Sequence, residues 1–212
     1  MTLIAPSLLA ANHAALADAA RDAEQAGADW LHVDVMDGHF VPPLTFGAGV
    51  VKDLKTATSL PLDVHLMVTN PAAQVPQFIA AGASRLAVHV ECEGAAEAVQ
   101  SIRAAGIPAG LALNPATSTE ALRPYVGQLS HITVMTVVAG AGGQALLPET
   151  LPKFAELRAM FGPEVLLVAD GGVNATTAAA VRAAGADVLV AGSAVFGAHD
   201  MSHVIVRLRQ GV

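Results

Sequence analysis

Two histidines and two aspartates in this sequence are residue types that bind metal ions. Two of the four are also spaced so that they would lie on the same face of a strand. His32 and Asp34 are two residues apart in one apolar run, while His65 and Asp170 belong to two further runs. If these runs are β-strands, residues two apart point to the same face of the sheet. Imidazole and carboxylate ligands together suit a divalent transition metal such as Zn, Mn, Fe or Co. We therefore predict that His32, Asp34, His65 and Asp170 bind one divalent metal ion.

The elements that must position these side chains are short apolar strands alternating with Ala-rich amphipathic helices. Several strands are continuous apolar runs, which is typical of parallel strands buried on both faces. Four helical stretches precede a glycine that would end the helix in a left-handed conformation, at Gly27, Gly82, Gly106 and Gly185. The helices include 14–26, 150–160 and 176–184, and the predicted strands are 3–5, 30–34, 62–66, 86–90, 109–113, 131–136, 165–169 and 188–191.

Eight strand and helix units in 212 residues predict an α/β fold, a (β/α)8 TIM barrel, as a single compact domain over residues 1–212. An open doubly wound sheet is the alternative, but no G-x-G-x-x-G motif follows the first strand. In a barrel the site is built at the C-terminal ends of the strands. The metal-ligand candidates fall there.

The composition excludes several function classes. Although 53% of the residues are hydrophobic, the longest uncharged stretch contains prolines and polar residues that a membrane-spanning helix would not carry. The net charge is −7 and there is no basic cluster, which disfavours a nucleic-acid partner. No cationic segment followed by an apolar one lies at Met1, so we expect no secretory signal, and the single cysteine, Cys92, cannot form an internal disulfide. We expect a cytoplasmic protein without a membrane or nucleic-acid partner.

Three glycine-bearing loops predict a phosphate site. They follow the sixth, seventh and eighth strands, and in barrels the loops after the last two strands bind phosphate through backbone N–H groups and a helix N-terminus. Three methionines at strand ends, Met36, Met67 and Met135, are predicted to line the same site. The loop residues are Gly140, Ala141, Gly142 and Gly143, then Gly171 and Gly172, then Gly192 and Ser193.

Other polar residues are interpreted as structural. Asp63 comes before the residues that form the inward face of the third strand, and Asp37 lies in the loop after the second strand. Both are therefore interpreted as turn residues. The remaining histidines without partner spacing are interpreted as ordinary polar positions: His13, His39, His131, His199 and His203.

Eight segments of the chain, in order, resemble the ribulose-phosphate 3-epimerase family. The most specific is His-Val-Asp-Val-Met-Asp-Gly-His-Phe-Val-Pro at 32–42, and the others are 5–9, 63–68, 114–117, 134–137, 142–144, 170–173 and 191–196. The resemblance implies a homo-oligomeric enzyme of the pentose phosphate pathway that interconverts D-ribulose 5-phosphate and D-xylulose 5-phosphate. It also implies that His32, Asp34, His65 and Asp170 hold the metal, and that Asp34 and Asp170 are the acid/base pair. Ser7, His65 and the backbone of the glycine loops would then bind this small phosphorylated ketose.

Three alternatives remain open. Residues 138–144 depart from the family pattern in a loop that would close over substrate, so 3-epimerisation of a ketohexose phosphate such as D-allulose 6-phosphate is one. A barrel lyase or synthase is disfavoured because no lysine lies at a predicted strand end. A non-catalytic phosphate-binding barrel is disfavoured because all four predicted metal ligands are present.

Overall fold

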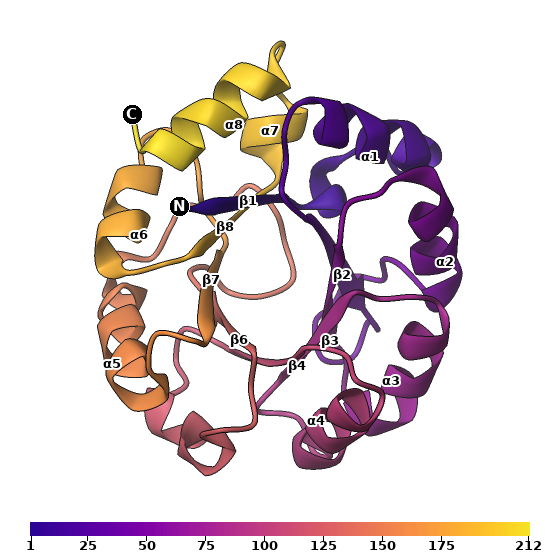
Figure 1. The fold of residues 1–212 in the computed structure, drawn as a ribbon, viewed down its shortest axis with the longest axis vertical. Helices are drawn as coiled ribbons and strands as arrows, with labels where there is room; N and C mark the ends of the chain where they lie inside the picture. The colour runs from indigo at the N-terminus through magenta and orange to yellow at the C-terminus, as the bar shows by residue number, and fades with distance from the viewer.

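A ring of eight parallel strands forms the centre of the molecule (Figure 1). The computed structural model describes residues 1–212. Neighbouring strands follow the order β1-β8-β7-β6-β5-β4-β3-β2, and an isolated parallel bridge between Ser7 and His32 joins β1 to β2. There the backbone N–H of Asp29 also donates to the carbonyl of Ile4 at 2.9 Å. The strands are β1 (Leu3–Pro6), β2 (Leu31–Met36), β3 (Leu62–Met67), β4 (Arg85–His89), β5 (Ala109–Leu113), β6 (His131–Met135), β7 (Leu166–Asp170) and β8 (Val188–Ala191).

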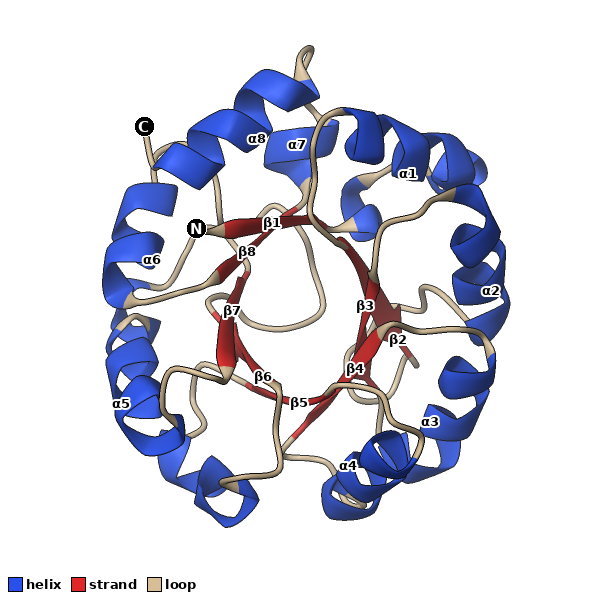
Figure 2. Ribbon diagram, viewed as in Figure 1, coloured by secondary structure: helices blue, strands red, loops and turns tan.

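Helices surround the ring (Figure 2). Their apolar faces pack against the outward side chains of the strands in one cluster of 46 buried residues. No helix is long and apolar enough to cross a membrane. The helices are α1 (Leu16–Gln25), α2 (Ala48–Ala57), α3 (Pro71–Ala80), α4 (Ala95–Ala104), α5 (Pro152–Phe161), α6 (Ala178–Ala184), α7 (Ser193–Phe196) and α8 (Met201–Gln210).

The predicted (β/α)8 TIM barrel is confirmed, with every strand within two residues of its predicted ends. Positive φ angles are also confirmed at the four glycines that follow helices, Gly27, Gly82, Gly106 and Gly185. The fifth unit differs, because β5 is followed by a 3₁₀ helix, Thr119–Tyr125, in place of an α-helix. Pro124 lies inside it and cannot donate a backbone hydrogen bond, although α3 accommodates Pro76 within an α-helix.

The interior of the ring has an apolar side and a polar side. Ala5, Val168, Val188 and Val190 form a separate small cluster with Trp30 beside β1, β7 and β8. Strands β2, β3, β4 and β6 instead bury polar side chains: His32, Asp34, Asp63, His65, His89, His131 and Thr133. Ion pairs and a hydrogen bond across strands link His32 to Asp63, Asp34 to His65, and His65 to His89. Both imidazole nitrogens of His131 and the hydroxyl of Thr133 are buried without a hydrogen-bond partner.

Two of the structural interpretations are wrong. Asp63 is a strand residue of β3 with 1% exposure, and its Oδ2 lies 2.8 Å from Nδ1 of His32. His131 is fully buried on β6, with Nε2 3.7 Å from Oδ1 of Asp63. Their partners lie on other strands, which no local sequence pattern specifies. The interpretation of Asp37 is confirmed, because its Oδ1 accepts hydrogen bonds from backbone N–H groups of the same turn. The other four histidines, His13, His39, His199 and His203, are exposed.

Replacing Gly110 by alanine is expected to destabilise the barrel. Gly110 pairs with His131 across β5 and β6, and a Cβ there would lie 2.3 Å from Nε2 of the imidazole. Overpacking of this kind costs about 1–3 kcal/mol. The control is Gly49→Ala in α2, where no atom lies within 4 Å of the added carbon, and it is expected to match or exceed the parent stability. Urea unfolding followed by circular dichroism measures both, and equal stabilities would contradict the expectation.

Candidate active site

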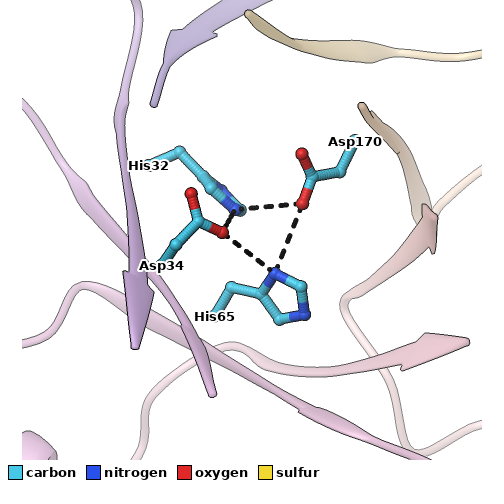
Figure 3. A group of neighbouring side chains, drawn as sticks. All are labelled: His32, Asp34, His65 and Asp170. Carbon is cyan, nitrogen blue, oxygen red and sulfur yellow. Dashed lines mark ion pairs between the residues drawn. The ribbon is translucent and has the colours of Figure 1, made fainter. Parts of the chain in front are cut away.

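Four side chains meet at one end of the ring with imidazoles and carboxylates in alternation, as Figure 3 shows. Nε2 of His32 lies 3.2 Å from Oδ1 of Asp34 and 3.4 Å from Oδ2 of Asp170. Nδ1 of His65 lies 3.4 Å and 3.3 Å from the same two oxygens. The four facing atoms all lie within 4.8 Å of one another. The structure therefore brings together the four residues proposed from sequence as metal ligands.

Strand geometry accounts for this meeting. His32 and Asp34 are two apart on β2, so both point inward, and Asp34 pairs in register with His65 on β3. Asp170 is the last residue of β7, on another side of the ring. The residues between them on β2 and β3, including Val33 and Val64, are fully buried in the outer apolar cluster. Packing of that cluster fixes the direction of each polar neighbour.

The arrangement fits a metal cation. Nε2 of His32 and Nδ1 of His65 are buried, have no hydrogen-bond partner, and face the carboxylate oxygens of Asp34 and Asp170. Two nitrogen lone pairs and two anionic oxygens directed at one point form a donor set suited to a divalent transition metal. A cation there would remove the cost of leaving buried nitrogens unpaired.

A second set of side chains orients both imidazoles. Oδ2 of Asp63 lies 2.8 Å from Nδ1 of His32, so Nε2 of His32 is the nitrogen that faces Asp34 and Asp170. Nε2 of His65 lies 2.9 Å from Nε2 of His89, whose Nδ1 lies 3.0 Å from Oε2 of Glu91. Asp63, His89 and Glu91 are not among the site residues predicted from sequence. The available signal for Asp63 was its spacing of two from His65, which places both on one face of β3. His89 ends β4 and Glu91 lies in the turn that follows, so strand spacing gives no signal for Glu91.

The charges of the two imidazoles and the two carboxylates shift one another's pKa values. Burial opposes the charged form of His32, but the carboxylates of Asp34 and Asp170 outweigh it and raise the pKa of this imidazole well above its ordinary value. The same opposition gives a raised pKa for His65. Burial would raise the pKa of Asp34 and of Asp170, but the two imidazoles outweigh it and lower both pKa values. Without a metal, the ring thus favours protonated histidines and ionised aspartates.

A pocket opens above the ring. Asp34 and Asp170 line it, whereas His32 and His65 lie beneath it, fully buried. None of the pocket-lining residues is a lysine or an arginine. Oγ of Ser7 donates to Oδ2 of Asp34 at 2.6 Å. The remaining residues predicted to bind substrate or line the site also line this pocket: Met36, Met67, Met135, Gly140, Ala141, Gly142, Gly143, Gly171, Gly172, Gly192 and Ser193.

The glycine loops present backbone N–H groups to this pocket. Those of Gly172, Gly192 and Ser193 have no backbone acceptor within the chain. Gly172 has φ +66°, and a Cβ there would lie 2.5 Å from the backbone nitrogen of Leu146, so only glycine fits. In the loop after β6, Nε2 of Gln144 donates to two backbone carbonyls at 2.7 and 2.8 Å and fixes the bend. Unpaired N–H groups at a pocket wall are suited to binding an anion.

Comparisons with known proteins point to one family. A model of the ribulose-phosphate 3 epimerase family matches residues 3–196. The chain is 43% identical to the ribulose-phosphate 3-epimerase of Bacillus subtilis, covering 99% of both proteins. It is 45% identical to that of Mycobacterium leprae, covering 98% of this chain and 94% of the relative.

Solved structures share the fold. A crystal structure of 3-hexulose-6-phosphate synthase has a TM-score of 0.73 at 22% identity and covers 100% of both chains. A 3-keto-L-gulonate-6-phosphate decarboxylase from Vibrio cholerae has the same TM-score at 18% identity, covering 99% of this chain and 96% of that one. These identities support a common barrel only. With the family model matching nearly the whole chain and relatives above 40% identity over at least 94% of their length, this chain belongs to the ribulose-phosphate 3-epimerase family.

Proposed function

We propose that this protein is a metal-dependent enzyme that interconverts D-ribulose 5-phosphate and D-xylulose 5-phosphate by moving a proton at C3. The observation that carries the proposal is the pair of carboxylates, Asp34 and Asp170, which reach one pocket from different sides of the ring. Inversion at a carbon beside a ketone needs a base on one face and an acid on the other. Family membership supports the same reaction.

In each aspartate, one carboxylate oxygen faces the imidazoles of His32 and His65, and the other is available to accept or donate the C3 proton. Oδ1 of Asp34 and Oδ2 of Asp170 face the imidazoles. Oδ2 of Asp34 is held by Ser7, and Oδ1 of Asp170 has no hydrogen bond within the chain. One carboxylate removes the C3 proton, the electron pair passes into the enediolate, and the other aspartic acid returns a proton to the opposite face. In the reverse reaction the roles exchange.

His32, Asp34, His65 and Asp170 would hold one divalent ion, Zn, Fe, Mn or Co. As a Lewis acid it would stabilise the negative charge that develops on the substrate oxygens, by several kcal/mol. Backbone N–H groups of the glycine loops would bind the phosphate, and the three methionines would exclude water from C3. These assignments rest on the shared pocket and the donor set.

The ketohexose phosphate alternative rests on one observation. The loop at 138–144 departs from the family pattern, and its residues 140–144 line the pocket. This loop lies close to Val41 in the loop after β2, since a Cβ added at Gly140 would lie 3.1 Å from Cβ of Val41. The relatives at 43% and 45% identity are ribulose-phosphate epimerases, which favours the pentose phosphate. A homo-oligomeric state and a cytoplasmic location remain predictions.

Removing either carboxylate is expected to stop proton exchange. In Asp34→Asn and Asp170→Asn, incorporation of solvent deuterium at C3 of D-ribulose 5-phosphate should fall by roughly 10²–10⁴-fold, because one acid/base partner is lost. Proton NMR follows the exchange, and calorimetry with an unreactive sugar phosphate should show retained binding. Asp53→Asn, on the exposed surface of α2, is the charge-matched control. Normal exchange in either site variant would refute the assignment.

Metal binding is expected to release protons. The pKa values of His32 and His65 are raised in the metal-free chain, so a proton must leave before each nitrogen binds a cation, and metal affinity should rise with pH. Protein purified without chelator should carry about one divalent ion per chain by elemental analysis. Titration calorimetry of the metal-free protein in buffers of different ionisation enthalpy counts the protons. Full activity without metal, or binding independent of pH, would contradict this ligand set.

Parallel assays are expected to favour the pentose phosphate. One additional carbon unit in a fitted pocket is worth about 1–3 kcal/mol. We therefore expect kcat/KM for D-ribulose 5-phosphate to exceed that for D-allulose 6-phosphate by at least about tenfold. A reversed preference would support the ketohexose alternative, and no turnover of either sugar would support a non-catalytic barrel.

A further inference from the structure

One of the four proposed metal ligands, His65, forms a buried pair with His89, which has no part in the proposed reaction. His65 on β3 and His89 at the end of β4 are both fully buried. Their rings lie at 23° to each other with centroids 5.0 Å apart, and their Nε2 atoms are 2.9 Å apart. Two nitrogens at this distance form a hydrogen bond only if one carries a hydrogen and the other does not.

The contacts of Nδ1 of His89 decide which of the two Nε2 atoms carries the hydrogen. Nδ1 of His89 lies 3.0 Å from the carboxylate oxygen Oε2 of Glu91 and 3.5 Å from the side-chain nitrogen of Asn114. The carboxylate is closer and, when ionised, can only accept, so it requires a hydrogen on Nδ1 of His89. A neutral His89 then has a bare Nε2 that accepts from Nε2–H of His65. The neutral His65 therefore has its free lone pair on Nδ1, the atom that faces Asp34 and Asp170.

Glu91, the last residue in this series of hydrogen bonds, is held by the loop after β5. Oε1 of Glu91 accepts from the backbone N–H of Asn114 at 2.7 Å and from the hydroxyl of Thr117. Nζ of Lys153, on α5, donates to the backbone carbonyls of Asn114, Pro115 and Thr117 at 3.0, 2.8 and 2.6 Å. These bonds fix the loop after β5, and with it the carboxylate. Burial would raise the pKa of Glu91, but the hydrogen bonds from His89, Thr117 and Asn114 outweigh it and lower the pKa to about 2.

We propose that His89 and Glu91 are positioning residues that set the tautomer and ring orientation of His65 so that its Nδ1 is available to a metal cation. The inference rests on the metal site in the proposed function, but not on the identity of the sugar. The hydrogen bonds run from Nε2–H of His65 to Nε2 of His89, and from Nδ1–H of His89 to Oε2 of Glu91. Asp63 supports His32 separately from β3.

Glu91→Gln tests the chain with nearly unchanged volume. An amide has one oxygen, so it cannot accept from His89 and from the Asn114 loop through separate oxygens as the carboxylate does. If the amide NH₂ faces His89, the tautomer of His89 reverses and its Nε2–H opposes that of His65. We expect zinc affinity, measured by competition with a chromophoric chelator, to fall roughly 10- to 100-fold.

Two control variants separate this role from charge and from loop packing. Glu93→Gln removes the same charge from an exposed residue two positions along the chain. Thr117→Val removes a loop contact of Glu91 and leaves the His89 contact in place. Neither should show a comparable loss of zinc affinity. Equal losses in Glu91→Gln and Thr117→Val would assign the effect to the loop and overturn the proposal.

A spectroscopic measurement needs no variant. In zinc-loaded protein with ¹⁵N-labelled histidines, long-range ¹H–¹⁵N correlation spectra should place the hydrogen on Nε2 of His65 and on Nδ1 of His89. A hydrogen on Nε2 of His89 would overturn the proposal. So would unchanged zinc affinity in folded Glu91→Gln, whereas failure of the parent protein to bind zinc or any other divalent ion would overturn the metal site itself.

Discussion

Two carboxylates share the buried end of this barrel because two imidazoles lie between them. The side chains of Asp34 and Asp170 are 6% and 11% exposed, and an uncompensated buried charge costs several kcal/mol. Alternation with His32 and His65 turns a like-charge repulsion into a set of four attractive contacts. The remaining polar architecture follows from this requirement: Asp63 and the His89 chain hold the imidazoles at the angles that the alternation needs.

The strands serve packing and chemistry with alternate residues. Each polar side chain on β2 and β3 has apolar neighbours in sequence that point outward into the helix layer, such as Val33 and Val35 beside Asp34. Full burial of a Val or Leu side chain is worth about 1.5–3 kcal/mol. Summed over the ring, this outer layer offsets the cost of a polar interior. A rigid outer layer also keeps the inward side chains within the narrow tolerance that a ligand set requires.

Local signals in the sequence were sufficient for the strands and for the four residues of the ring. Continuous apolar runs mark the strands, four of which follow a glycine that ends a helix, and a spacing of two at a strand end marks His32 and Asp34. Asp63 and His131 could not be assigned in this way, because each has its partners on other strands, and pairing register is a property of the closed barrel. The 3₁₀ form of the segment after β5 has no comparable local signal, because a proline lies inside this segment and also inside the α-helix α3.

The walls of the pocket contain no cationic side chain. Recognition of a phosphate by the glycine loops would then depend on main-chain dipoles, and in particular on positions such as Gly172 where a side chain cannot be accommodated. The specificity for an anion would then depend on the absence of side chains at these glycines. Reagents that modify lysine or arginine would find no target there, and the determinants of recognition would change chiefly when a substitution adds bulk to the loop.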